Sequence, residues 1–148
     1  MQEAVPVGIG TMAAIIGLEA SKVEEACNEA KASGIVEIAN LNCPGQIVIA
    51  GEIAAVELAC EKAKEKGAKR AIVLSVSAPF HSSMLKPAAQ KLEIELKNIK
   101  FDDMTIPLMT NVNGDYVKSK DDIKGNLKLQ VMSSVLWETI IKRMIKDG

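Results

Sequence analysis

The stretch IVEIANLNCPGQIVIAG, from Ile35 to Gly51, decides the fold of this chain. Its first half, Ile35 to Asn42, alternates apolar and polar residues over several positions, which is typical of a strand with one buried face. The dipeptide Pro44-Gly45 predicts a turn. The apolar run GQIVIAG follows that turn and predicts a second strand. The stretch is therefore predicted to form a β-hairpin.

Similar elements flank the hairpin on both sides. Before it, the apolar run from Thr11 to Leu18 predicts a buried strand. A helix follows that strand and carries apolar residues at helical spacing on one face: Val23, Ala26, Cys27 and Ala30. After the hairpin, a second helix has an apolar face made by Ile53, Val56, Cys60 and Ala63. A strand from Lys69 to Val76 completes the order strand, helix, strand, strand, helix, strand, which predicts a ferredoxin-like βαββαβ subdomain over residues 9–76.

The remaining residues, 77–148, have a different pattern. The loop SAPFHSS leads into a predicted helix from Met84 to Asn98. A strand is predicted over TIPLMTNV, Thr105 to Val112, and two helices over Asp121–Met132 and Leu136–Lys146. A parallel sheet needs neighbouring strands, and this part supplies one clear strand. We therefore expect an α/β fold in which residues 77–148, with 1–8 as the end of a preceding helix, form part of a larger core.

Composition restricts the class of partner. The chain has 148 residues, of which 48% are hydrophobic, and a formal net charge of -1, so it has no bulk attraction for nucleic acid or an anionic membrane. Two Phe, one Tyr and one Trp are too few to build a base-stacking platform. No CxxC or CxH pair occurs, so no metal site is predicted. Three cysteines without a signal peptide, and no apolar stretch of membrane-spanning length, favour a cytoplasmic protein with reduced thiols.

The one histidine of the chain, His81, is the strongest candidate for chemistry. A lone histidine is more often structural than catalytic. However, His81 lies on a loop between a strand and a helix, where α/β folds place reactive groups. Ser82 and Ser83 beside it could be nucleophiles, but no Gly-x-Ser-x-Gly elbow surrounds them, and N-capping of the next helix is the favoured explanation.

Four segments carry a family resemblance: SAPFHSSMLKPAAQKL, NCPGQIVIAGE, KGAKRAIVLSVSAPFH and the opening MQEAVPVGIGTMAAIIGL. Together they closely resemble the malonyl-CoA:acyl carrier protein transacylases of fatty acid synthesis, and the resemblance runs along essentially the whole chain. It implies a ferredoxin-like subdomain inserted into an α/β-hydrolase-like acyltransferase core. It also implies a ping-pong reaction in which a serine takes malonyl from malonyl-CoA and the phosphopantetheine thiol of acyl carrier protein then removes it. No tightly bound cofactor is implied.

The resemblance assigns roles to particular residues. His81 is the implied general base, and the backbone carbonyl of Gln130 orients its ring in place of an Asp side chain. Phe80 is implied to favour malonyl over methylmalonyl, although a simple core position explains it about equally well. Further substrate-binding positions are implied for Asn40, Asn42, Gln46, Met1 and Arg70. Turn formation explains Asn42 equally well, and a solvated helix face accounts equally well for the basic cluster that includes Arg70.

The chain also departs from the family's pattern. The nucleophile elbow Gly-His-Ser-Leu-Gly does not occur in it, and the family places its malonyl-binding arginine just before the position of Met1. Near Gln130, Ser134 and Leu136 stand where the family often has Pro and a polar residue. We therefore expect a C-terminal fragment that supplies the base but not the serine and is inactive alone, with a dimer covering the surface left open. The alternatives are a stand-alone ferredoxin-like interaction or ligand-binding module without catalysis and, less favoured, a hydrolase that uses Ser82 or Ser83.

Overall fold

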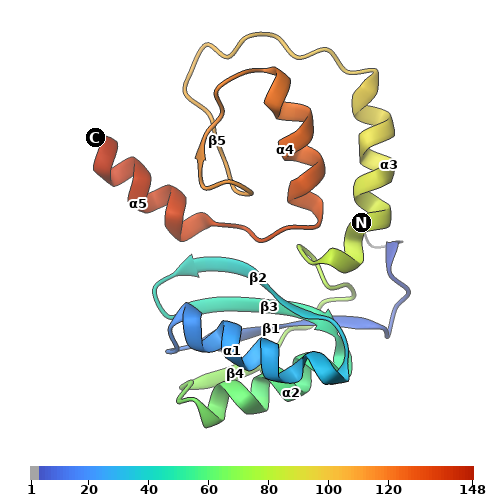
Figure 1. Ribbon diagram of the computed structural model, residues 1–148, viewed down its shortest axis with the longest axis vertical. Helices are drawn as coiled ribbons and strands as arrows, with labels where there is room; N and C mark the ends of the chain where they lie inside the picture. Colours follow the sequence, from blue (N-terminus) through green and yellow to red (C-terminus); the bar gives the residue numbers. More distant parts are fainter. Residues whose placement is uncertain (1–3) are drawn as a thin grey trace.

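The protein is described by a computed structural model that covers residues 4–148. A four-stranded sheet with two helices forms one part of the molecule, and three further helices lie beyond the edge strand of that sheet labelled β2 (Figure 1). No helix within the described residues is long and apolar enough to cross a membrane.

The sheet part contains the six elements predicted around the hairpin. They are β1 (Gly10–Ile16), α1 (Ala20–Ala30), β2 (Val36–Cys43), β3 (Gln46–Glu52), α2 (Ile53–Glu65) and β4 (Arg70–Val73). The strand order is β2-β3-β1-β4, and every neighbouring pair is antiparallel. The hairpin is confirmed as β2 and β3. The last strand is shorter than predicted, since its pairing with β1 covers only Arg70 to Val73.

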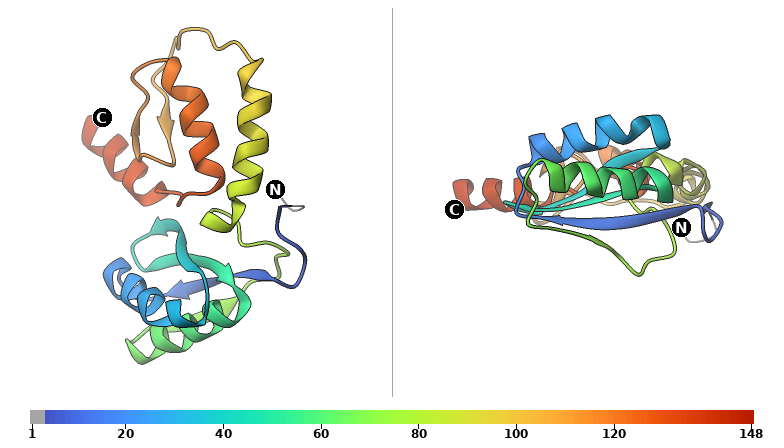
Figure 2. Two further views of the ribbon diagram at one scale, coloured as in Figure 1. Left: turned by 45° about the vertical axis from the view of Figure 1, so that its right-hand side comes forward. Right: turned by 90° about the horizontal axis from the view of Figure 1, so that it is seen from below.

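Both helices cover the same face of the sheet (Figure 2). The predicted apolar face of α1 is confirmed in full, since its buried residues are Val23, Ala26, Cys27 and Ala30. These side chains pack on alternate strand residues such as Ala13, Ile15 and Ile49. The other face of the sheet carries a smaller apolar cluster of Met12, Ala39, Val48 and Ala50. Strand alternation thus divides the buried residues between the two faces.

The remaining elements follow a long loop from β4. They are a 3-10 turn (Ser83–Leu85), α3 (Lys86–Lys97), β5 (Met109–Thr110), β6 (Asp115–Tyr116), α4 (Asp121–Val131) and α5 (Trp137–Asp147). The three predicted helices are confirmed. The predicted strand over Thr105–Val112 is wrong in extent, because only Met109 and Thr110 pair with a neighbouring strand. The Ile106 side chain is 75% exposed, so the first part of the predicted strand packs on nothing that would hold it extended.

A short segment between α4 and α5 attaches this second part to the sheet. Val135 forms a parallel bridge with Asn40 on the edge strand β2. The Val135 N–H donates to Ala39 O at 2.8 Å, and the Leu41 N–H donates to Val135 O at 2.9 Å. These bonds satisfy backbone groups that an edge strand otherwise leaves unpaired. The turn after α4 is therefore fixed relative to β2.

The three free cysteines differ in their exposure to solvent. Cys27 on α1 and Cys60 on α2 are 4% and 6% exposed, whereas Cys43 at the end of β2 is exposed. Burial raises the pKa of the Cys27 thiol from 9.0 to about 12, because the charged thiolate is poorly solvated there. Burial also raises the pKa of the Cys60 thiol. Both thiols are expected to react slowly with alkylating reagents while the chain is folded.

The raised pKa of Cys27 predicts a loss of stability in alkali. Above pH 9 the unfolded chain releases the Cys27 proton while the folded chain keeps it, so the free energy of unfolding falls as pH rises towards 12. The expected contribution of Cys27 between pH 8 and pH 10 is a loss of about 1.4 kcal/mol. Urea unfolding of Cys27→Ala at both pH values should show a smaller decline by that amount. Cys43→Ala is the exposed control, and equal declines in parent and Cys27→Ala would contradict the prediction.

Candidate active site

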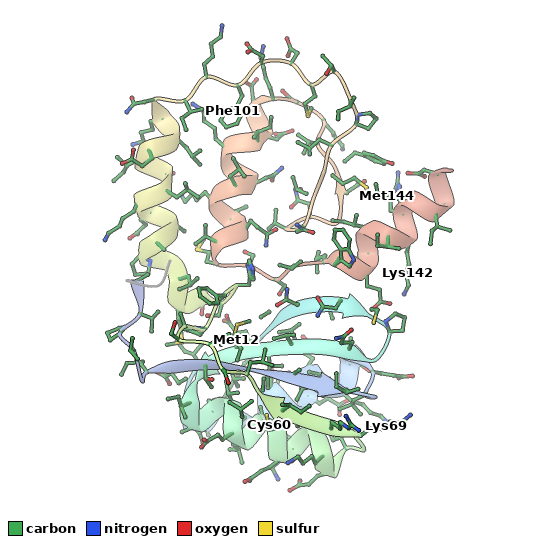
Figure 3. All side chains as sticks on the ribbon, turned by 180° about the vertical axis from the view of Figure 1, so that it is seen from behind. Met12, Cys60, Lys69, Phe101, Lys142 and Met144 are labelled. Carbon is green, nitrogen blue, oxygen red and sulfur yellow. The ribbon has the colours of Figure 1, made fainter. Side chains whose placement is uncertain are left out.

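The loop between β4 and α3 crosses the face of the sheet that α1 and α2 leave open. Its Phe80 side chain packs against the small apolar cluster that contains Met12 and Ala39. Met12 belongs to this smaller cluster, whereas Cys60 on α2 belongs to the larger core on the helix-covered face of the sheet (Figure 3). Phe80 is half-buried there, which fits the core explanation of this residue at least as well as a role in selecting the acyl group.

His81 adopts an uncommon backbone conformation. Its φ of 59° lies in the left-handed region, and no other non-glycine residue within 4–148 has a positive φ. Such a conformation costs about 1–3 kcal/mol and persists only where the surroundings hold it. The next residue contributes, since the Ser82 hydroxyl is fully buried and donates to Pro79 O at 2.7 Å. A second tie comes from the sheet, where Glu37 Oε2 accepts the Ser83 N–H at 2.7 Å.

These bonds correct the prediction that Ser82 and Ser83 cap the following helix. The Ser82 hydroxyl bonds back to Pro79, and neither the 3-10 turn nor α3 has a side-chain cap hydrogen bond. Leu85 occupies the N-cap position of α3. The loop doubles back tightly between Pro79 and Ser82, so this hydroxyl meets a carbonyl before it can reach a helical N–H. A fully buried, donating hydroxyl is also poorly suited to act as a nucleophile.

The imidazole of His81 contacts the end of α4. Its Nδ1 lies 3.1 Å from the carbonyl oxygen of Gln130. Gln130 is in the last turn of α4, where carbonyl groups have no partner within the helix, so its oxygen is available. A carbonyl can only accept, and the contact therefore requires the ring proton on Nδ1. Nε2 then carries the lone pair and is the atom able to take a proton.

The turn that follows Gln130 holds its carbonyl in place. The Gln130 Nε2 amide donates to Ser133 O at 3.1 Å, and the Ser134 hydroxyl donates to Ile38 O on β2 at 2.5 Å. The Ser134 hydroxyl thus supplies a link to the sheet that a proline at this position would lack. Gln130 Oε1 is buried without a hydrogen-bond partner in the part of the chain that the structure describes.

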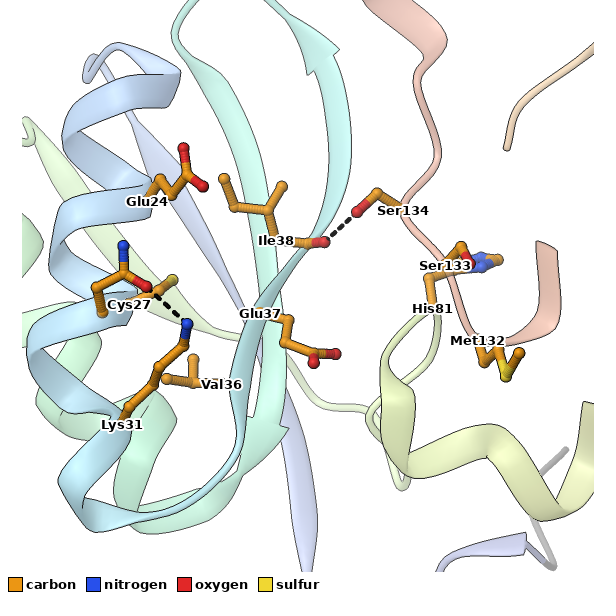
Figure 4. A pocket seen from close by; sticks show the side chains of 11 residues that line it. Glu24, Cys27, Lys31, Val36, Glu37, Ile38, His81, Met132, Ser133 and Ser134 are labelled. Atoms are coloured by element: carbon orange, nitrogen blue, oxygen red, sulfur yellow. Dashed lines mark hydrogen bonds between the residues drawn. The ribbon is translucent and has the colours of Figure 1, made fainter. Parts of the chain in front are cut away.

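His81 lines a cavity of about 380 Å³ between α1, the edge of β2 and the turn after α4 (Figure 4). That volume lies within the range of small-molecule pockets. Its wall is mostly polar and includes Glu24, Lys31, Glu37 and Ser133. Neither Glu37 nor Ser133 stood out in the sequence, and Ser134 did so only as a departure from the family pattern. Their positions follow from the packing of segments far apart in the chain, and no local signal marks them.

The other predicted substrate-binding residues do not share this cavity with His81. Asn40 and Asn42 are half-buried on β2, and neither lines it. Gln46 is exposed on β3, where its Oε1 accepts the Cys43 thiol at 3.4 Å. Arg70 is exposed on β4, the edge strand opposite β2. Met1 lies outside the described residues. Among those residues, no cluster of three or more His, Cys, Asp or Glu side chains is arranged to hold a metal ion.

An imidazole whose Nδ1 proton is held by a carbonyl, with no partner on Nε2 among the described residues, has the form of the base in nucleophilic acyl transfer. The fold agrees with that class. A malonyl CoA-acyl carrier protein transacylase structure from Clostridium perfringens is 48% identical with a TM-score of 0.97, covering 100% of this chain and 46% of its own. A malonyl-transacylase solved with a type II PKS acyl-carrier protein is 41% identical with a TM-score of 0.96, covering 99% of this chain and 48% of its own.

Curated relatives give the same result. The malonyl CoA-acyl carrier protein transacylase of Bacillus subtilis is 48% identical over 149 residues, which is 100% of this chain and 47% of the relative. That of Escherichia coli K12 is 45% identical over 148 residues. No protein-family model matches the chain. The chain is homologous over its whole length to the malonyl CoA-acyl carrier protein transacylases, and it spans about half the length of the curated relatives it matches.

Proposed function

We propose that this chain provides the general-base half of a malonyltransferase site. In the proposed reaction, His81 Nε2 takes the proton of a serine hydroxyl as that oxygen attacks the malonyl thioester. The ring then gives the proton to the departing coenzyme A thiolate. In the second half, Nε2 takes the proton of the pantetheine thiol of acyl carrier protein, and that sulfur displaces the serine oxygen, which regains the proton. The contact between His81 and the Gln130 carbonyl carries this proposal.

The serine must come from a polypeptide segment other than these 148 residues. The Gly-His-Ser-Leu-Gly elbow of the family is absent from the sequence, and the buried hydroxyl of Ser82 already has a carbonyl partner. This burial argues against Ser82 as the nucleophile of a hydrolase, whereas Ser83 is exposed. The chain alone is therefore expected to be inactive and to need a second half that supplies the serine, the oxyanion donors and a cation for the malonyl carboxylate.

We also propose a division of the chain into two structural parts. Residues 9–76 would be a ferredoxin-like subdomain, as the strand order β2-β3-β1-β4 supports, and residues 77–148 would be part of an α/β-hydrolase-like core. The bridge from Val135 to Asn40 joins the two parts, which favours this arrangement over an independent ferredoxin-like module. A cytoplasmic location, and a dimer that covers the surface left open by the missing half, stay predictions.

The proposed substrates are malonyl-CoA and the phosphopantetheine thiol of acyl carrier protein. The solved complex of a homologous malonyl-transacylase with an acyl-carrier protein supports the second. Phe80 would border the acyl group, with Asn40, Asn42 and Gln46 along the pantetheine arm and Arg70 drawing acidic partners.

Reconstitution tests the proposal. The chain is mixed with a polypeptide carrying the part of the Bacillus subtilis transacylase that it does not match; this mixture is called the reconstituted transferase below. Transfer of radiolabelled malonyl from malonyl-CoA to acyl carrier protein is expected only when both halves are present. Inactivity of a complex that has demonstrably assembled would overturn the proposal. Tight binding of carrier protein or coenzyme A by the chain alone would instead favour the module hypothesis.

A further inference from the structure

We propose that Glu37 is a positioning residue for His81. Its carboxylate holds the loop backbone at Ser83, so that the imidazole stays on the Gln130 carbonyl with Nε2 turned to the reacting groups. The inference deepens the proposed function and rests on it. Neither the sequence patterns nor the family resemblance singled out Glu37.

Strand alternation places Glu37 opposite the loop. Its neighbour Val36 is buried on the helix side of the sheet, while Ala39, two positions on from Glu37, belongs to the cluster that Phe80 covers. Residues two apart on a strand share a face, so Glu37 projects towards the loop that carries His81. Figure 4 shows the Glu37 side chain between β2 and the His81 ring, and both residues line the same cavity.

The loop needs such a tie because its backbone is strained at His81. The φ of 59° is held in place by contacts that surround it. The Ser82 hydroxyl bonds within the loop, to Pro79 O, and the imidazole bonds to α4. The Ser83 N–H to Glu37 Oε2 bond, at 2.7 Å, is the hydrogen bond that fastens this turn to the sheet. Ser83 also begins the 3-10 turn, where an N–H has no acceptor within the turn itself.

A carboxylate suits this position better than a neutral acceptor. A hydrogen bond to an ionised acceptor is shorter and about twice as strong as a neutral one. Glu37 Oε2 makes this bond at one end of the rigid strand β2, whose pairing with β3 fixes its place. The Glu37 bond therefore fixes the loop relative to β2. The turn after Gln130 is fixed to the same strand through Ser134, so the distance between the imidazole and the Gln130 carbonyl is fixed as well.

The test uses the isotope-labelled chain and its single histidine. In Glu37→Ala, hydrogen exchange of the Ser83 amide should become at least about tenfold faster, because a charge-assisted bond is lost. The share of neutral imidazole with its proton on Nδ1 should fall, as read from the ring ¹⁵N chemical shifts. Glu37→Gln keeps an acceptor oxygen, so the Ser83 exchange rate and the share of imidazole protonated on Nδ1 should both lie close to the parent values. In the reconstituted transferase, Glu37→Ala should lower kcat about tenfold, with KM little changed.

Glu24 provides the matched control. It lines the same cavity from α1, and its carboxylate makes no hydrogen bond to the loop within the described residues. Glu24→Ala removes the same charge from the cavity and should leave the Ser83 exchange rate and the ring signature unchanged. The inference is overturned if Glu37→Ala leaves both signals at the parent values, or if Glu24→Ala changes them equally.

The outcomes separate this inference from the proposed function. A reconstituted transferase that is inactive with Glu37 in place contradicts the proposed function, while the Ser83 and ring signals of the chain alone still decide the role of Glu37. An active transferase that is insensitive to Glu37→Ala contradicts the inference and leaves the proposed function standing.

Discussion

Replacing His81 by Asn is expected to lower malonyl transfer by the reconstituted transferase about 10²- to 10⁴-fold, the usual contribution of a general base. Asn is the informative substitution because it tolerates the left-handed backbone that His81 adopts. The loop should therefore keep its shape while Nε2 is lost. Steady-state kinetics should show the loss in kcat, with KM for malonyl-CoA changed little, because the imidazole acts on the proton rather than on substrate binding.

Ser83→Ala is the control for this experiment. It keeps the backbone N–H that bonds to Glu37 and removes only the hydroxyl. Activity near the parent value is expected, whereas a hydrolase that uses Ser83 would lose its nucleophile. Full activity of His81→Asn would show that another group takes the serine proton, and the base assignment would then be wrong.

Replacing Gly51 by Ala is expected to unfold the chain or to lower its free energy of unfolding by about 3 kcal/mol or more, at the upper end of the cost of overpacking. A Cβ at this position would lie 2.0 Å from the backbone oxygen of Ile35 and 2.7 Å from Val36 Cα. Both atoms belong to the backbone, so no side chain can turn away to make room. Gly51 also pairs with Val36 in the sheet, and relief would require β2 to separate from β3.

Gly125→Ala is the matched control, because it makes the same change in open space. Gly125 lies inside α4, and no atom would come within 4 Å of an added Cβ. Alanine is favoured over glycine in a helix interior, so a gain of about 1 kcal/mol is expected. Urea unfolding of the three proteins measures both effects. A Gly51→Ala variant as stable as the parent would contradict the packing described at β2.

Periodicity was sufficient to predict the sheet part of the molecule. The spacing of Val23, Ala26, Cys27 and Ala30 defined the buried face of α1, and the turn at Pro44-Gly45 located the hairpin. Each of these patterns involves residues that are close together in the sequence, and each element buries one face against its neighbours. The strand predicted from Thr105 failed for the opposite reason, since an apolar run becomes a strand only where a partner strand is present.

The site was predictable only in part. His81 was identifiable because it is the one histidine and lies on a loop after a strand, and the Gln130 contact came from the family resemblance. Two bonds of the site, from Ser83 to Glu37 and from Ser134 to Ile38, join residues that are far apart in sequence. The left-handed backbone of His81 depends on how the loop packs. No local pattern encodes such contacts, because they form only once β2, the loop and the turn after α4 have packed together.

We propose that the Gln130 carbonyl fixes the His81 proton on Nδ1 and leaves Nε2 as the base. The single histidine of the chain makes this directly measurable by ¹⁵N-edited NMR of the ring, at a pH where the imidazole is neutral. We expect a protonated Nδ1 and an Nε2 with the chemical shift of an unprotonated nitrogen. A ring protonated mainly on Nε2, or one that averages freely between the two tautomers, would contradict it.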